Sequence, residues 1–180
     1  MFCRQCEQTK DNYACTTVGV CGKSAETAVV QDALLHQIKS LSLWCVAARE
    51  AGATAEQLHE ANVYTLKAMF STLTNVNFSE DRIHAYCLQG EAIKDQVKGL
   101  VSSLGGTAPS GPVAEVNMAG IDAVTLEALG MTVSVPARKL AMNHDDSFSL
   151  NEVATYGAKV CINLCICSNL LCPWTFYSIH

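Results

Sequence analysis

The sequence predicts an all-α protein in which a helical bundle follows a cysteine-rich N-terminal loop. Three observations support this fold class. Apolar residues recur at three- and four-residue steps between residues 24 and 104, residues that favour helix N-termini precede these stretches, and no strand-type alternation persists anywhere. At 180 residues the chain is also long enough to bury a core without help from metals or cross-links.

The first expected helix follows the loop of residues 1–23. Ser24 is a suitable N-cap, and Gly52 can adopt the left-handed conformation that ends many helices. The apolar stripe between them consists of Val30, Leu34, Ile38, Leu41, Cys45 and Ala48.

Two further helices complete a first bundle over residues 24–104. Thr54 and Gln57 form a capping-box pattern for the second helix, and Ser79 can cap the third. Their stripes run through Leu58, Ala61, Thr65, Met69 and Leu73, and through Ile83, Tyr86, Cys87, Ile93, Val97, Leu100 and Leu104.

Beyond the bundle the pattern is weaker. Residues 105–112 are rich in glycine, proline and serine, which predicts a linker. Residues 113–159 predict a partial second helical part, with a short helix around residues 125–129 that Gly130 ends.

The C-terminal stretch changes composition. Ser149 and Glu152 form another capping box, which predicts a helix that runs to Lys159. The tail over residues 160–180 carries four cysteines and no charged side chain before His180, and we expect it not to belong to the fold. It would just reach across a bilayer, but two asparagines and a proline disfavour a spanning helix, so no membrane association is expected.

Charge and cysteine usage narrow the class of protein. The net charge is −5, with 12 Lys and Arg against 17 Asp and Glu and no basic run, so a nucleic-acid partner is not expected. Met1 is followed directly by the cysteines, without a secretory signal, which predicts a cytoplasmic protein. Because thiols stay reduced there, ten cysteines indicate metal binding more than disulfides.

Four of these cysteines lie within the first 21 residues: Cys3, Cys6, Cys15 and Cys21. A C-x-x-C pair directs two thiolates to one metal centre, because two intervening residues let the chain turn around the metal. Two further cysteines on the same loop complete a set of four soft ligands. Such a set suits either tetrahedral zinc or an iron–sulfur cluster.

The spacing favours the cluster over zinc, and either of them over disulfides. Structural zinc sites usually combine two closely spaced pairs, whereas five residues separate Cys15 from Cys21. The cluster with its thiolates is anionic, and the helix that begins at Ser24 points the positive end of its dipole at the loop. Bare backbone and positive charge near the sulfurs would come from Gly19, Gly22, Arg4, Lys10 and Lys23.

No other residues predict a site. Cys45 and Cys87 lie on apolar helix faces, where free cysteines usually behave as small buried hydrophobes. The tail cysteines Cys161, Cys165, Cys167 and Cys172 are interpreted as incidental thiols. Because His36, His59, His84 and His144 have no nearby nucleophile, no catalytic residue is predicted.

The chain resembles the N-terminal domain of the hybrid cluster protein family, also called the prismane or hydroxylamine reductase family, over MFCRQCEQT, ACTTVGVCGKSAETAVVQDAL, AAREAG and FSTLTNVNF. The resemblance covers residues 1 to about 100 and returns at residues 153–159. It implies a helical domain of two three-helix bundles. It also implies that Cys3, Cys6, Cys15 and Cys21 bind a cluster. Their spacing is similar to that of family members with 4Fe–4S, whereas members with longer gaps carry 2Fe–2S.

The chain also departs from that family. Family members are considerably longer, and their hybrid iron–sulfur–oxygen cluster lies in later domains that this sequence lacks. We therefore expect an electron-transfer domain, served by a redox partner protein, of an enzyme that reduces hydroxylamine or a related nitrogen oxide. We expect neither the hybrid cluster nor reductase activity in this chain alone, which would be a truncated homologue, a fragment, or the product of a frame shift near Val160. The alternatives are a zinc-stabilised helical binding module and a truncated fragment without function.

Overall fold

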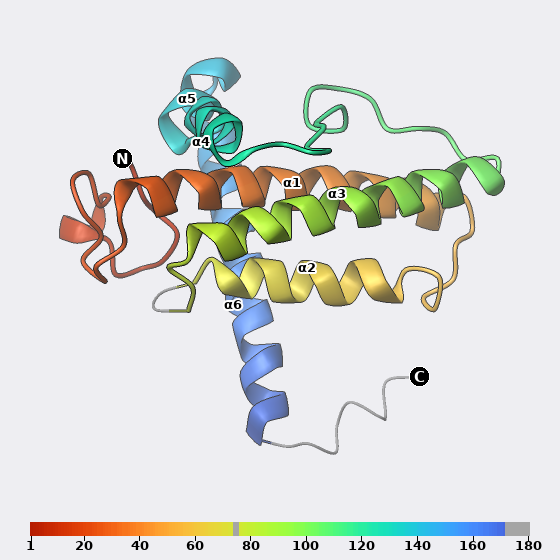
Figure 1. Ribbon diagram of the computed structural model, residues 1–180, viewed down its shortest axis with the longest axis horizontal. Helices are drawn as coiled ribbons and strands as arrows, with labels where there is room; N and C mark the ends of the chain where they lie inside the picture. The colour runs from red at the N-terminus through yellow and green to blue at the C-terminus, as the bar shows by residue number, and fades with distance from the viewer. Residues whose placement is uncertain (74–75, 172–180) are drawn as a thin grey trace.

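The computed structural model describes residues 1–73 and 76–171, and over these residues the protein is all-α, as predicted. A short 3-10 helix, η1 (Lys10–Asn12), lies in the N-terminal loop before the α-helices (Figure 1). Within the described ranges there is no strand, and the only strand-like pairing is a single bridge in that loop. The helices are α1 (Ala25–Glu50), α2 (His59–Ser71), α3 (Glu80–Ser103), α4 (Ala123–Thr132), α5 (Val135–Met142) and α6 (Asp145–Leu171).

Helix α1 is the centre of the fold. It packs against α2, α3 and α4, while α6 crosses the layer of α1, α2 and α3 and contacts α2 and α5 (Figure 1). The N-terminal loop lies beside the first turns of α1, at the same end of the layer as the end of α2 and the start of α3 (Figure 1). This arrangement brings the loop within reach of both α1 and α6.

The predicted helix starts are confirmed where a side chain caps the backbone. The Ser24 hydroxyl accepts a hydrogen bond from the Thr27 amide at 3.0 Å, and Ser79 accepts one from the Arg82 amide at 3.3 Å. Thr54 and Gln57 make both hydrogen bonds of a capping box, at 2.9 and 3.3 Å. The box does not start a helix, however: irregular turns follow it, so the predicted start of the second helix at Thr54 is wrong and α2 begins only at His59.

The predicted helix end at Gly52 is also confirmed. Gly52 has φ +95°, and the following Ala53 amide donates to the Ala48 carbonyl at 2.9 Å. Gly105 ends α3 in the same way, with φ +69° and a 2.9 Å bond from the Gly106 amide to Val101. Both ends satisfy carbonyls that the last turn of a helix leaves free.

Gly130 does not end α4, contrary to the sequence prediction. The helix continues to Thr132, and Gly130 is instead the point where α4 meets α1. A Cβ built on Gly130 would lie 2.3 Å from the Val29 carbonyl oxygen, so only glycine permits this helix contact. The residue is therefore explained by packing and not by a change of backbone direction.

Two further elements differ from the prediction. Helix α5 was not expected; Pro136 stands in its first turn, where the fixed φ of proline suits a helix start. Helix α6 begins at Asp145, so the predicted start at Ser149 is wrong. Asp145 and Asp146 occupy its first turn, where carboxylates interact favourably with the helix dipole.

The predicted end of the last helix at Lys159 is wrong as well, because α6 continues through residues 160–171 of the expected tail. The rest of that tail, with Cys172 and Pro173, lies outside the described residues, as do the side chains of Cys165 and Cys167. None of the described helices is both long and apolar enough to cross a membrane.

Cys45 and Cys87 belong to the core between α1, α2 and α3, as predicted. Their exposed fractions are 4% and 0%. Burial raises the pKa of the Cys87 thiol to about 12, so this thiol stays protonated at neutral pH. The same core contains Leu34, Leu41, Leu58, Ile83 and Val101.

A buried ion pair joins α3 to the segment that leads to α4. The Lys94 ammonium lies 2.8 Å from a Glu91 oxygen, and both side chains are almost fully buried. The same oxygen of Glu91 accepts hydrogen bonds from the Met118 amide at 3.0 Å and from Gln37 at 3.1 Å. Lys94 also donates to the Val116 carbonyl. The pair thus links α1, α3 and the segment that leads to α4.

Two glycines of similar helical context test the contact between α4 and α1. We expect Gly130→Ala to destabilise the protein by about 2 kcal/mol, because the added methyl group must push α4 away from the backbone of α1. Gly99→Ala is the control: Gly99 is exposed in α3, and no atom lies within 4 Å of the added Cβ. This variant should gain about 0.5–1 kcal/mol. Urea unfolding followed by circular dichroism measures both, and equal effects would contradict the described contact.

Candidate metal centre

The first and third cysteines of the loop are brought together by backbone pairing. The Cys3 amide donates to the Cys15 carbonyl at 3.0 Å, and the Cys15 amide donates back to Cys3 at 3.1 Å. The exposed fractions of Cys3 and Cys15 are 7% and 5%, and both pack against Ala28 in the first turns of α1. Two candidate ligands therefore meet next to the N-terminus of this helix.

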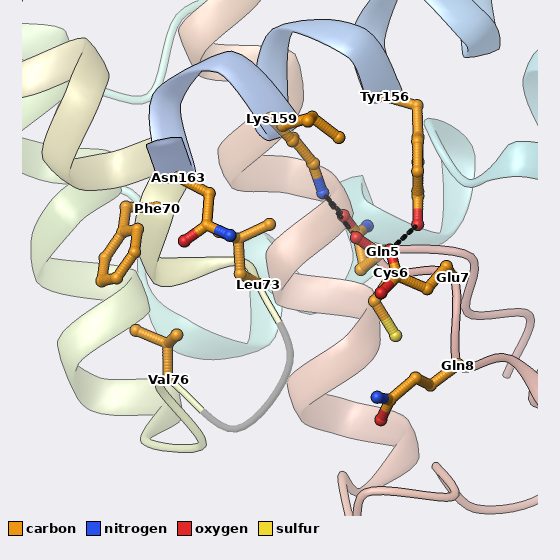
Figure 2. Close-up of a pocket in the computed structure, with 11 residues that line it drawn as sticks. Gln5, Cys6, Glu7, Gln8, Phe70, Leu73, Val76, Tyr156, Lys159 and Asn163 are labelled. Carbon is orange, nitrogen blue, oxygen red and sulfur yellow. Dashed lines mark hydrogen bonds between the residues drawn. The ribbon is translucent and has the colours of Figure 1, made fainter. Parts of the chain in front are cut away.

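Cys6 and Cys21 lie at the more open side of the loop, and both are half-buried. Cys6 lines a cavity of about 190 Å³ between the loop, the end of α2 and α6 (Figure 2). Cys21 lies against Gly19, where a Cβ would come within 3.1 Å of the Cys21 sulfur. In the described part of the chain, no three His, Cys, Asp or Glu side chains are already arranged around a common metal position.

The loop backbone offers donors to the sulfurs. The Val20 amide points at the Cys15 sulfur at 3.5 Å. A tight turn carries this amide: Gly19 donates to the Lys23 carbonyl at 2.9 Å, and Gly22 has φ +89°. Four thiols, an amide aimed at one of them and a glycine against another fit an iron–sulfur cluster, whose sulfurs accept such hydrogen bonds.

The loop also carries the three predicted cations, but they differ in how far they are buried. Lys23 is 2% exposed and donates to Gln31 of α1, whereas Arg4 and Lys10 are exposed to solvent. Burial raises the pKa of the Cys3 thiol, and the charge of Lys23 partly opposes this shift. At neutral pH the Cys3 thiol is therefore protonated when no metal is bound, and metal binding has to displace that proton.

A residue between the first two cysteines connects the loop to two helices. Gln5 is 4% exposed, and its amide nitrogen donates to Asp32 of α1 at 2.6 Å. Its amide oxygen accepts from the Lys159 ammonium of α6, which also donates to the Gln5 backbone carbonyl at 3.3 Å (Figure 2). Burial raises the pKa of Asp32 to about 7 and lowers the pKa of Lys159 to about 7.

Sequence reasoning missed Gln5, Asp32 and Lys159. One indication was available: Asp32 stands beside the apolar stripe of the first helix, where a carboxylate needs a partner. A second contact missed in the same way joins Tyr156 of α6 to Glu7 of the loop at 3.2 Å (Figure 2). The His84 Nε2 atom forms a hydrogen bond with the Ile121 carbonyl at 2.6 Å.

Comparison with known proteins agrees with the loop and the fold. The model of the Prismane/CO dehydrogenase family matches residues 1–163, from the cysteine loop into α6. The chain belongs to this family. The residues of α6 that contact the loop, Tyr156 and Lys159, lie inside the match, so this family region contains both sides of the contact.

Relatives within the family are named hydroxylamine reductases. The protein from Methanosarcina mazei is 39% identical over 160 residues, which cover 88% of this chain and 27% of that protein. The protein from Rippkaea orientalis is 35% identical over 164 residues, with 89% of this chain and 28% of that protein covered. This chain thus spans little more than a quarter of the length of these curated relatives.

Proposed function

We propose that Cys3, Cys6, Cys15 and Cys21 hold a 4Fe–4S cluster and that this chain is the electron-transfer domain of a hydroxylamine-reductase-type oxidoreductase. The observation that carries the proposal is the backbone bridge between Cys3 and Cys15, with the Val20 amide aimed at the Cys15 sulfur. When bound, the cluster would supply one-electron transfer. A 2Fe–2S cluster is the less favoured form.

The chain's own residues would hold and shield that group. Cys3 and Cys15 are buried against α1, which limits the access of water and oxidants to two ligands. Cys6 and Cys21 are half-buried and lie on the side from which a redox partner protein would deliver electrons. A compartment that keeps thiols reduced, the cytoplasm, suits such a loop.

Reduction of hydroxylamine or a related nitrogen oxide would take place in the parts of the relatives that have no counterpart here. The proposal therefore assigns this chain no hybrid cluster, no catalytic residue and no turnover of its own. Electrons would pass from the loop to a reaction centre elsewhere in the full-length enzyme.

Metal analysis of the 180-residue chain tests the proposal. The protein is expressed and purified without oxygen, and iron, acid-labile sulfide and zinc are measured per chain together with the visible absorption and hydroxylamine reduction. We expect about four iron and four sulfide ions per chain, a brown colour and no turnover. About two irons would indicate 2Fe–2S instead. A colourless protein with a single zinc would establish the zinc-stabilised module, and turnover of hydroxylamine would overturn the non-catalytic role.

A further inference from the structure

Gln5 lies between the two cysteines of the C-x-x-C turn, and its buried side chain hydrogen-bonds to α1 and α6. It follows Cys3 by two residues and directly precedes Cys6, so its backbone sets the relative position of the two candidate ligands. The adjacent Arg4 is exposed, whereas Gln5 is buried between α1 and α6. A displacement of Gln5 would therefore move both cysteines.

The charged forms of Asp32 and Lys159 favour one orientation of the Gln5 amide. Its nitrogen faces the carboxylate of Asp32, and its oxygen faces the ammonium of Lys159. A reversed amide would direct its N–H groups at an ammonium and its oxygen at a carboxylate, which are repulsive pairs. Because the Lys159 ammonium also binds the Gln5 backbone carbonyl at 3.3 Å, main chain and side chain are held by the same group (Figure 2).

We propose that Asp32, Gln5 and Lys159 form a clamp that positions the Cys3–Cys6 turn to ligate the cluster. This inference rests on the proposed function, and it gives a role to residues that carry no ligand atom. The clamp joins the loop to α1 through Asp32 and to α6 through Lys159. Neither helix alone supplies both a carboxylate and an ammonium to Gln5, so correct placement of the turn requires α6 to be docked.

The clamp acts on ligand position, so its loss should change cluster retention more than helix stability. Groups that orient metal ligands from the second layer typically change metal affinity by 10- to 100-fold. We therefore expect Gln5→Leu and Lys159→Met to release iron to a ferrous chelator about tenfold faster than the unaltered protein. Hydrogen exchange at the amides of residues 4–7 should rise by a similar factor, also in metal-free protein.

Lys67→Met is the matched control, because Lys67 is an exposed lysine on α2 that is not part of the clamp. Lys159→Arg retains a cationic donor and should restore part of the retention that Lys159→Met loses. Circular dichroism shows whether each variant is folded. Gln5→Leu alters a loop residue and leaves every helix sequence unchanged, so it decides the matter if a Lys159 variant fails to fold.

The outcomes separate this inference from the proposed function. Fast iron release and fast exchange in Gln5→Leu, with normal behaviour of Lys67→Met, support the clamp. Unaltered release and exchange in Gln5→Leu, when the starting protein carries its cluster, overturn the clamp and leave the proposed function intact. If the starting protein carries no iron–sulfur cluster under anaerobic conditions, the proposed function fails, and the ligand-positioning role fails with it.

Discussion

Replacing Cys15 by serine is expected to remove the iron–sulfur cluster from the protein. Cys15 pairs with Cys3 through two backbone bonds, and its sulfur faces the Val20 amide. A serine oxygen is a harder and more weakly acidic ligand than a thiol sulfur, so it binds iron poorly in a sulfur-rich site. The substitution leaves the backbone pairing intact, and we expect a folded protein with little iron.

Iron and sulfide analysis after anaerobic purification measures this effect, with circular dichroism as the test of folding. Cys161→Ser is the control, because Cys161 is an exposed cysteine on α6 that the proposal excludes from the site. It should retain the full cluster. Serine at Cys3, Cys6 or Cys21 should remove the cluster in the same way as Cys15→Ser. Full iron content in Cys15→Ser would contradict the assignment of this ligand.

Of the substitutions proposed here, Glu91→Ala should lower the free energy of unfolding most, by about 3–5 kcal/mol. The substitution leaves the Lys94 ammonium buried without its carboxylate, and it removes the acceptor of the Met118 amide. An unpaired buried charge costs more than the pair contributes, because its desolvation is no longer offset. Urea unfolding of the metal-free protein, followed by circular dichroism, gives the free energy of unfolding directly.

Asp95→Ala provides a matched comparison on the same helix. Asp95 pairs with Lys98 at 2.8 Å, the same separation as between Glu91 and Lys94, but the Asp95 side chain is 58% exposed. Exposed ion pairs usually contribute less than about 1 kcal/mol, so this variant should be close to unaltered. If both variants lost equal stability, burial would not be the property that makes Glu91 important.

The helices that the sequence predicts best are those with local start and stop chemistry. Ser24, Ser79, Gly52 and Gly105 act within one turn of their own position, so their effects are readable from neighbouring residues. The prediction that Gly130 ends a helix is wrong because the role of this residue is not local. It contacts Val29, about a hundred residues earlier in the chain. The early start of α6 was missed because a Ser149–Glu152 pattern suggested a cap where the helix was already under way.

The candidate site divides in a similar way. The four cysteines are recognisable from residue type and spacing alone, and the structure brings Cys3 and Cys15 together as neighbours. Whether all four cysteines bind one metal centre is tested by the iron, sulfide and zinc measurements proposed above. The groups that support the turn could not be identified from spacing, because Gln5 and Lys159 meet only after α6 has crossed the bundle.

The contact between Gln5 and Lys159 also sets an order of events during protein synthesis. These residues are 154 positions apart, and a ribosome that adds about 5–20 residues per second makes the second about 8–30 s after the first. During that interval the cysteines of the nascent chain are free thiols on a loop that lacks its contact to α6. We therefore expect nascent chains stalled before Lys159 to release iron about tenfold faster than the complete chain, as the Lys159→Met variant should.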